Sequence, residues 1–312
     1  MPARTFHHSA FSAERIASER ARSGLGVSVC LPARECAGTV GEIVSALGRL
    51  REAGAIDRIV VVDAASPDGT ADAAARAGAE VWQEAELEPS FGPVLGKGDA
   101  MWRSLSRLDT ELVCFLDADS EGFSAHFATG LLGPLVCEPG VAFVKAFYRR
   151  PLAPDAAGPG EPAPTAPASS QEGGGRVNHL TARPVLALLY PELADIRQPL
   201  AGEVAARREL LERLPFATGY GVETAMLIDA WREVGVEGIA QVDLEEHRNR
   251  HQPLRALAPM ALTVLATALS RAQRDGRATL MPPADAMAHA PPERPPLASL
   301  AQGAARAGGG EA

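Results

Sequence analysis

The sequence lacks three features that would indicate particular classes of protein: closely spaced cysteines, an excess of basic residues, and a hydrophobic run long enough to cross a membrane. The four cysteines, Cys30, Cys36, Cys114 and Cys137, include no C-x-x-C pair. This spacing indicates no disulfide framework, so we expect these side chains to be buried as small hydrophobic residues. A reducing cytoplasm fits this use of cysteine.

Acidic residues outnumber basic ones, 39 to 30, and the formal net charge is −9. A protein that binds nucleic acid non-specifically needs a strongly basic face, so the charge argues against nucleic acid as a partner. The same charge is compatible with a local basic pocket for a small phosphorylated molecule.

The longest mostly apolar segment covers residues 254–269 and contains Arg255 and Pro259. It falls short of the roughly 20 apolar residues of a membrane-spanning helix. The N-terminal stretch carries acids and arginines without an apolar core, so it does not predict a signal peptide. With 46% hydrophobic residues the chain can form a sizeable core. We expect a cytoplasmic protein without a membrane span.

Strand and helix patterns alternate along the first half of the chain. Strands are predicted at 27–33, 56–66, 80–83 and 111–119, and helices at 14–22, 39–53, 98–108 and after the turn at 67–69. Helices at 179–190, 203–213 and 222–234 and a strand at 238–243 follow. This alternation is typical of a doubly wound α/β sheet, whose ligands bind beyond the carboxyl ends of the strands.

Two carboxylates, Asp117 and Asp119, directly follow the buried run 112–116. Oxygen ligands of this kind suit Mg²⁺ or Mn²⁺, and such an ion neutralises a diphosphate leaving group. A strand that ends in an Asp-rich turn would have the same sequence. Polar clusters at 32–36 and 63–66 also follow predicted strands, which favours a site at this edge of the sheet.

Lys97 lies between two glycines at the start of a predicted helix, where backbone can approach an anion closely. Contact with phosphate or sugar and a solvated turn lysine are both open interpretations. Arg176 follows a run of three glycines that ends at Gly175, and Asn178 lies two residues further on. These groups could hold a phosphate or carboxylate, or could simply end the preceding linker.

His247 comes just after the last predicted strand and could complete a metal site begun by the carboxylates, with His251 as a competitor. Glu203 and Glu223 follow glycines where helices are predicted to begin. Acids at such positions are usually helix caps, although Glu223 could equally bind sugar hydroxyls.

Together these motifs resemble the actinobacterial glucosyl-3-phosphoglycerate synthases and their mannosyl-3-phosphoglycerate relatives, which are retaining GT-A glycosyltransferases. The matching stretches are V-C-L-P-A, V-V-D-A-A-S-P-D-G-T, G-K-G-D-A-M-W-R-S-L, F-L-D-A-D, V-K-A-F-Y-R-R-P-L, G-G-G-R-V, R-Q-P-L-A-G-E, P-F-A-T-G-Y-G-V-E-T and E-H-R-N-R. They occur in family order over roughly residues 25–270. The last five together are far more specific than the D-x-D triplet alone.

The resemblance implies roles for individual residues. The nucleotide-sugar would be bound by Pro32, Ala33, Arg34, Glu35, Cys36, Ala64, Lys97, Asp117, Ala118, Tyr220, Gly221, Val222 and Glu223. The metal ligands would be Asp119 and His247, and 3-phosphoglycerate would be held by Gly175, Arg176, Val177, Asn178, Arg248 and Asn249. Asp119, Leu200 and Glu223 would take part in catalysis, with backbone near Leu200 steadying the oxocarbenium-like centre.

The resemblance also implies the organisation of the chain. A GT-A type, Rossmann-like mixed sheet flanked by helices would carry a smaller C-terminal acceptor-binding part. A lead-in helix (1–24) would precede a nucleotide-sugar-binding α/β half (25–150), a flexible Pro/Ala/Gly loop (151–174), an acceptor-binding half (175–275) and a disordered tail (276–312). A homodimer is implied, through the apolar segment at 254–269.

Two departures from the family pattern concern the nucleoside. Glu35 and Cys36 stand where the family usually has Asn and Glu, and D-S-G-S has become Asp63-Ala64-Ala65-Ser66. Both changes leave the preferred base open.

The function expected is transfer of glucose from UDP-glucose, or another nucleoside diphosphate glucose, to the 2-hydroxyl of D-3-phosphoglycerate with anomeric retention. Alternatives are a mannosyl-3-phosphoglycerate synthase that uses GDP-mannose, transfer to another phosphorylated or lipid-linked alcohol, a sugar nucleotidyltransferase, and a non-catalytic sugar-nucleotide-binding module.

Overall fold

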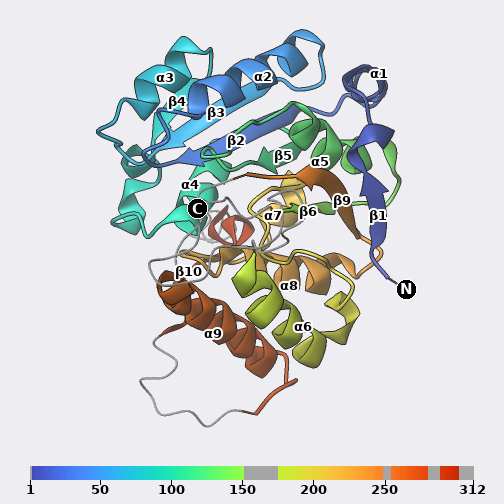
Figure 1. Cartoon of the computed structure of the whole chain (residues 1–312), viewed down its shortest axis with the longest axis vertical. Helices are drawn as coiled ribbons and strands as arrows, with labels where there is room; N and C mark the ends of the chain where they lie inside the picture. Colours follow the sequence, from blue (N-terminus) through green and yellow to red (C-terminus); the bar gives the residue numbers. More distant parts are fainter. Residues whose placement is uncertain (1, 151–174, 249–253, 280–288, 302–312) are drawn as a thin grey trace, which may run out of the picture.

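An eight-stranded mixed sheet runs through the centre of the protein (Figure 1). The computed structural model describes residues 2–150, 175–248, 254–279 and 289–301. In spatial order the strands are β1 (Arg4–His7), β9 (Ile239–Glu246), β6 (Phe143–Arg149), β7 (Val204–Arg207), β5 (Leu112–Phe115), β2 (Val27–Ala33), β3 (Arg58–Asp63) and β4 (Glu80–Gln83). Strand β7 pairs antiparallel with β6 and β5, and every other neighbouring pair in this sheet is parallel. The predicted mixed α/β sheet is confirmed.

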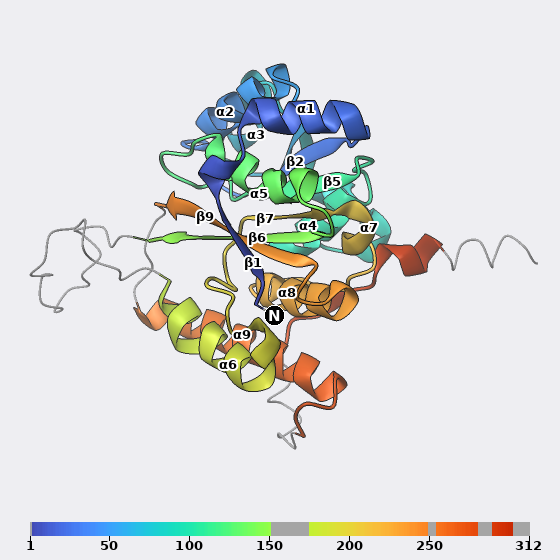
Figure 2. The same cartoon turned by 90° about the vertical axis from the view of Figure 1, so that its right-hand side faces the viewer.

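Helices cover both faces of this sheet (Figure 2). One face packs against α1 (Ala13–Ser23), α2 (Val40–Glu52), α3 (Thr70–Arg76) and α5 (His126–Cys137). The other packs against α4 (Lys97–Leu105), α6 (Arg183–Leu189), α7 (Arg208–Leu211), α8 (Val222–Val234) and α9 (Ala258–Arg274). Strands buried on both faces need continuous hydrophobic runs, which is why 27–33 and 112–115 contain no charged residue.

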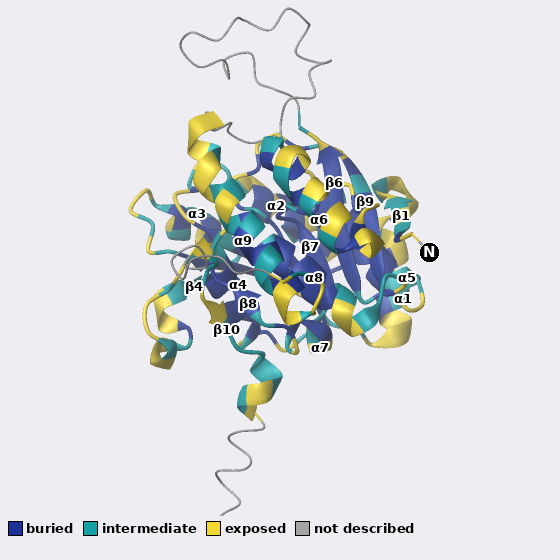
Figure 3. Ribbon diagram, turned by 90° about the horizontal axis from the view of Figure 1, so that it is seen from below, coloured by how far each residue is buried: buried dark blue, intermediate teal, exposed yellow. Residues whose placement is uncertain are grey.

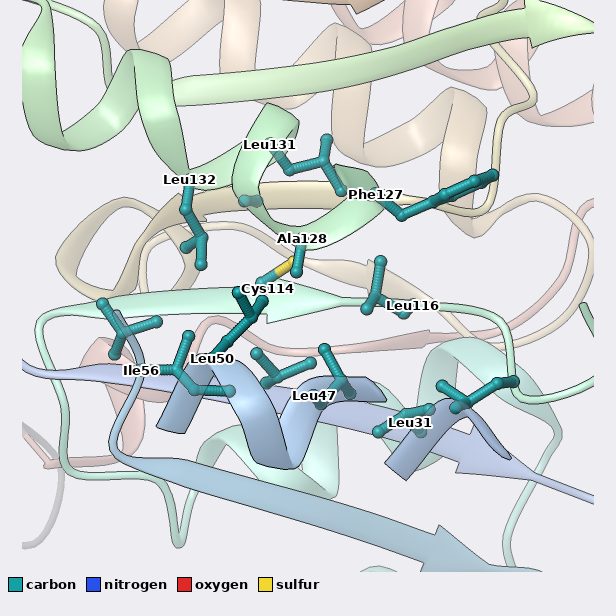
Figure 4. Packing of buried hydrophobic residues seen from close by; sticks show 14 of the residues in the cluster. Leu31, Leu47, Leu50, Ile56, Cys114, Leu116, Phe127, Ala128, Leu131 and Leu132 are labelled. Carbon is teal, nitrogen blue, oxygen red and sulfur yellow. The ribbon is translucent and has the colours of Figure 1, made fainter. Parts of the chain in front are cut away.

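The core beside β2 and β5 is made of closely packed aliphatic side chains (Figure 4). Leu47 and Leu50 of α2 and Leu131 and Leu132 of α5 enter it from opposite sides of Cys114. Cys30, Cys36 and Cys114 are buried free thiols and Cys137 is partly buried. Burial raises the pKa of the Cys30 thiol to about 12, so this residue behaves as a small hydrophobic side chain.

The prediction of a helix over 203–213 was wrong for its first half. Residues Val204–Arg207 form β7, which hydrogen-bonds to strands on both sides, and only Arg208–Leu211 is helical. Alanine favours helices locally, but burial of Ala205 and Ala206 between two strands outweighs that preference. The sequence prediction also missed β1, α5 and β6 as elements.

The prediction of a disordered tail from residue 276 was wrong for residues 276–279 and 289–301. Strand β10 (Glu293–Arg294) pairs antiparallel with β8 (Phe216–Ala217). Trp102 Nε1 donates to Pro295 O at 2.8 Å, and the Arg294 guanidinium lies 2.7 Å from Asp99. These contacts attach the segment to α4. The predicted loop at 151–174 and residues 280–288 and 302–312 of the tail lie outside the described residues, and the division into two halves stays a prediction.

Candidate active site

The Asp117–Asp119 triplet begins two residues after β5, at the carboxyl end of the strand. Thr39 Oγ1, at the start of α2, donates to Ala118 O at 2.6 Å and so fixes the middle of the triplet. Gly202 lies directly beside Asp117, because a Cβ built there would come within 2.3 Å of the carboxylate oxygen Oδ2. The absence of a side chain at residue 202 therefore makes room for Asp117.

Lys97 joins two carboxylates from different elements. Its Nζ lies 2.5 Å from Asp117 Oδ1 and 3.2 Å from Glu223 Oε1, in the first turn of α8. Burial opposes the charge on Lys97, but these carboxylates outweigh it and hold the pKa of the ammonium above its usual value. Burial likewise acts to raise the pKa of Asp117, and Lys97 outweighs it, so that pKa is lowered. Lys97 and Asp117 are therefore both charged at neutral pH.

Asp119 lies at the surface beside this pair. The pKa of the Asp119 carboxyl is raised, mainly by its partial burial and to a smaller extent by the negative charge of Asp117. Lys97 and His247 act in the opposite direction. A bound cation would offset the repulsion between the Asp117 and Asp119 carboxylates. Asp119 thus has the electrostatic environment of a metal ligand.

His247 is buried behind Asp119 with only 2% of its surface exposed. Its Nε2 lies 2.8 Å from Ser120 Oγ and 3.2 Å from Glu203 Oε1, and its ring stacks on Tyr148 with 4.6 Å between centroids. Within the described residues its Nδ1 has no hydrogen-bond partner. A buried imidazole nitrogen of this kind fits a divalent ion, and with Asp119 supplies one nitrogen and one oxygen donor.

Glu203 was interpreted as a helix cap, and this was wrong because the strand β7 begins at the next residue. Its carboxylate is 1% exposed, accepts from Tyr148 Oη at 2.7 Å and lies beside His247. Arg150 in turn donates to Tyr148 Oη at 2.9 Å. A chain of contacts thus runs from the cavity surface at Arg150 to the imidazole of His247.

A cavity of about 300 Å³ opens beside Lys97, Asp117, Asp119 and Glu223. Gly175, Arg176, Val177 and Asn178 also line it, together with Leu200 and Tyr220. Lys97 and Glu223 are 126 positions apart in the chain, and the fold brings both to this cavity. The cavity therefore joins the two groups of predicted residues, the acids with Lys97 and the segment 175–178 that contains Arg176.

Asn178 orders the turn that carries Leu200. Leu200 N donates to Asn178 Oδ1 at 3.4 Å, and Asn178 Nδ2 donates to Arg197 O at 3.2 Å. The buried Lys145 of β6 donates from Nζ to the next carbonyl, Ala201 O, at 2.5 Å. The backbone around Leu200 is thus held from both sides.

The predicted nucleoside residues Pro32–Cys36 and Ala64 lie beside the cavity at the ends of β2 and β3, and do not line it. Their loop is organised by hydrogen bonds from Glu35 N to Ser66 Oγ at 2.9 Å and from Cys36 N to Thr70 Oγ1 at 2.8 Å. Burial raises the pKa of Cys36 to about 11, so its thiol is neutral. The Glu35 and Arg34 side chains point to solvent.

Some predicted residues are not brought into the cavity. Arg248 pairs with Glu246 at 2.7 Å, and its side chain is 69% exposed. Gly221 and Val222 are buried at the start of α8, where Gly221 packs against Thr267 of α9. Asn249 and His251 lie outside the described residues.

The sequence analysis missed Arg150, Gln198, Gly202, Met260 and Val264 as cavity-lining residues. Arg150 and Gln198 belonged to matching stretches, R-R-P-L and R-Q-P-L, which was the available signal. Met260 and Val264 carry ordinary helical spacing, and no local signal separates them from core residues.

The chain is similar in sequence to characterised proteins over most of its length. It is 40% identical over 280 residues to the glucosyl-3-phosphoglycerate synthase of Petrotoga mobilis. The matched region covers 89% of this chain and 83% of that protein. It is 43% identical over 253 residues to the corresponding protein of Mycolicibacterium smegmatis, over 81% of this chain and 80% of the relative. The chain belongs to the glucosyl-3-phosphoglycerate synthase family.

Solved structures agree with this family assignment, although no family model matches the chain. The mannosyl-3-phosphoglycerate synthase of Rubrobacter xylanophilus superimposes with a TM-score of 0.85 at 41% identity, covering 95% of this chain and 97% of that one. The glucosyl-3-phosphoglycerate synthase of Mycobacterium tuberculosis, solved with Mn²⁺, UDP-glucose and phosphoglyceric acid, gives a TM-score of 0.79 at 35% identity, covering 96% and 99%. The family resemblance and the GT-A fold are confirmed.

Proposed function

We propose that this protein is a hexosyltransferase that moves glucose from UDP-glucose to the 2-hydroxyl of D-3-phosphoglycerate, with retention at the anomeric carbon. The observation that carries the proposal is one cavity lined by Lys97, Asp117, Asp119 and Glu223 together with Arg176 and Asn178. Such a cavity can hold a diphosphate and a sugar on one side and a small anionic acceptor on the other.

Asp119 and His247 would hold the divalent ion, Mg²⁺ or Mn²⁺, and the relatives' structures with Mn²⁺ or Mg²⁺ and UDP support this choice. When bound, the ion neutralises charge on the diphosphate leaving group. In the described part of the chain no third carboxylate, imidazole or thiol joins Asp119 and His247. Two protein ligands leave coordination positions for the donor's phosphate oxygens.

Lys97 supplies a fixed positive charge beside the leaving group, an electrostatic contribution that requires no reorganisation during the reaction. Its two carboxylate partners hold the ammonium in place. Arg176, with the Gly175 backbone and Asn178, would bind the acceptor's phosphate or carboxylate and orient its hydroxyl. The loop 32–36 with Ala64 would hold the nucleoside, with Tyr220 to Glu223 beside the donor sugar.

Among the described cavity residues no carboxylate stands ready as a covalent nucleophile. Asp117 and Glu223 are both paired with Lys97, and Asp119 would be engaged by the metal ion. Retention would therefore proceed by front-face attack, in which the departing phosphate takes the acceptor proton. Backbone near Leu200 would steady the oxocarbenium-like centre. A trapped glycosyl-enzyme adduct on any of these carboxylates would refute this mechanism.

GDP-mannose is the second candidate donor, because the Rubrobacter xylanophilus relative is a mannosyl-3-phosphoglycerate synthase. Family membership weighs against the nucleotidyltransferase hypothesis. Incubation with Mg²⁺ or Mn²⁺ and a panel of nucleoside diphosphate sugars, with and without 3-phosphoglycerate, separates the possibilities. Release of UDP from UDP-glucose only when 3-phosphoglycerate is present supports the proposal. Preferred turnover of GDP-mannose favours the second donor, and binding without turnover favours a non-catalytic module.

We further propose a homodimer that uses α6 and α9. Four large hydrophobic side chains on or beside these helices are exposed, Leu180, Leu188, Leu254 and Leu262. The two helices lie side by side on one face of the molecule (Figure 3). Sedimentation of the wild type as a monomer at micromolar concentration would refute this arrangement.

No helix in the described part of the chain is long and apolar enough to span a bilayer. The free thiols support a location in the reducing cytoplasm, which cell fractionation tests.

A further inference from the structure

A second cluster of metal-ligating side chains lies at the edge of the sheet formed by β1. Its members are His7 and His8, where β1 passes into the short helix η1 (His8–Ala10), and Glu245 near the end of β9. Their ligand atoms all lie within 4.8 Å of one another, and within residues 2–150, 175–248, 254–279 and 289–301 this is the one group of three such residues. The roles assigned to the active site do not use any of them.

The distances match tetrahedral coordination. Glu245 Oε1 lies 3.5 Å from His7 Nε2 and 3.3 Å from His8 Nε2. Ligands about 2.0–2.1 Å from a tetrahedral zinc ion are separated by about 3.3 Å. Both distances exceed the 2.7–2.9 Å of a strong charge-assisted hydrogen bond, and in the absence of an ion the two imidazoles pair directly with Glu245.

Two features of the imidazoles bear on this role. His8 Nε2 is buried and has no hydrogen-bond partner in the part of the chain that the structure describes. His7 Nδ1 accepts from Ser9 N at 3.2 Å and lies 2.8 Å from Ser9 Oγ. A metal ion at Nε2 requires the tautomer in which Nδ1 donates to Ser9 Oγ and gives up the contact with Ser9 N. Histidines that bind metals usually donate their other ring N–H to such a partner.

The backbone of β9 places Glu245 beside the histidines. The register between β6 and β9 shifts between Phe147 and Arg149, so β9 carries an extra residue there. Glu245 adopts φ = 66°, in the left-handed region, and its N–H donates to Asp243 Oδ1 at 2.9 Å. A bulge of this kind re-aims a side chain, and here it brings a carboxylate to the end of a strand that is parallel to β9.

We propose that His7, His8 and Glu245 form a site for a zinc-class transition-metal ion, separate from the active site. Two imidazoles and one carboxylate suit Zn²⁺ and disfavour Mg²⁺, which requires oxygen ligands. The side chains of His7 and Glu245 are 46% and 56% exposed, so water can complete the coordination. The ion fastens the four-residue edge strand β1 to β9, whose paired residues are 236 positions apart in the chain.

The test is a Zn²⁺ titration against a chromophoric chelator, with Mg²⁺ in excess throughout. Wild type is compared with His7→Ala, His8→Ala and Glu245→Gln. His289→Ala, at an exposed histidine outside the cluster, is the matched control, and His247→Ala removes the imidazole of the active site. The thermal midpoint of each protein is recorded with and without Zn²⁺.

We expect wild type, His289→Ala and His247→Ala to share one Zn²⁺ equivalent whose affinity falls about tenfold or more in the three cluster variants. The zinc-induced rise in thermal midpoint should be lost with it. His7→Ala and Glu245→Gln change exposed side chains, so the test stands even if His8→Ala folds poorly. Equal stoichiometry and affinity in wild type and the cluster variants would overturn the proposal. Stabilisation that depends on acidic pH alone would also overturn it, because it would identify simple ion pairs.

Discussion

The Lys97 ammonium lies 2.5 Å from Asp117 Oδ1 and 3.2 Å from Glu223 Oε1, and so connects the end of β5 with the start of α8. The donor's diphosphate is proposed to bind at this place. In the absence of donor the two carboxylates keep the lysine charged and fixed, since they hold its pKa above the usual value.

Replacing Lys97 with Ala should lower kcat/KM for the donor by about 100-fold to 1,000-fold, the effect typical of removing one transition-state charge donor. Lys97→Arg should recover part of this loss because it restores the charge. Steady-state UDP release measures both variants, with Arg22→Ala, at an exposed helix position, as the control. A Lys97→Ala protein that turns over at the wild-type rate would remove Lys97 from the mechanism.

His247→Ala should raise the Mn²⁺ concentration needed for half-maximal turnover, because it removes the nitrogen donor buried behind Asp119. We expect a shift of about tenfold to 100-fold, and full loss of activity with EDTA in every variant. His251→Ala tests the competing histidine, and the exposed His179→Ala is the control. Equal effects at residues 247 and 251 would show that His247 was wrongly chosen.

Arg176→Ala should raise KM for 3-phosphoglycerate by about tenfold to 100-fold, the loss expected for a charge-assisted hydrogen bond of about 1.5–3 kcal/mol. KM for UDP-glucose should change little, since Arg176 is proposed to bind the acceptor and not the donor. The neighbouring exposed Arg183→Ala is the matched control. A loss of donor affinity in place of acceptor affinity would contradict the assignment.

Gly202→Ala should displace Asp117, because the new Cβ would lie 2.3 Å from Oδ2 and 2.5 Å from Oδ1. The Lys97 contact would be lost with it, and we expect turnover to fall at least about tenfold. Gly48→Ala in α2 meets nothing within 4 Å and should stabilise the protein by about 0.5–1 kcal/mol. Denaturant unfolding and UDP release measure the two effects, and an active Gly202→Ala protein would show that Asp117 can shift freely.

Lys145 predicts a pH dependence of stability. Burial lowers the pKa of this lysine from 10.5 to about 8, and it is 1% exposed. Between these two pKa values the unfolded chain binds more protons than the folded one, so the free energy of unfolding should rise with pH. The change is about 3 kcal/mol over the whole window.

Lys145→Met should abolish this contribution. The quantity to compare is the difference in unfolding free energy between wild type and variant, at about pH 7.5 and about pH 9.5, from denaturant titrations. Taking the difference cancels the contributions of cysteines and tyrosines, which titrate in alkaline solution in both proteins. A difference that stays constant with pH would show that Lys145 stays charged in the folded protein, with a pKa that burial does not lower.

Local patterns predicted much of the first half of the sheet. The strands at 27–33 and 80–83 and the helix at 222–234 have the predicted bounds, because continuous apolar runs and helical spacing are local signals. Strand β7 was misjudged, since Val204–Arg207 becomes a strand through pairing with β5 and β6 on either side. Such pairing depends on residues far along the chain and leaves no local trace.

The sequence by itself determined the α/β class, the family and the residue types that a glycosyl-transfer site requires, because motifs and hydrophobic periods are written in consecutive residues. Only the tertiary structure decided which of these residues share a cavity. It placed Arg150 beside Tyr148 and left Arg248 paired with Glu246 at the surface. It also showed that Glu203, expected to be a helix cap, is a partner of His247. Residues 289–301, expected to be disordered, contact α4. These outcomes depend on strand order and burial, which are properties of the whole chain and not of any segment.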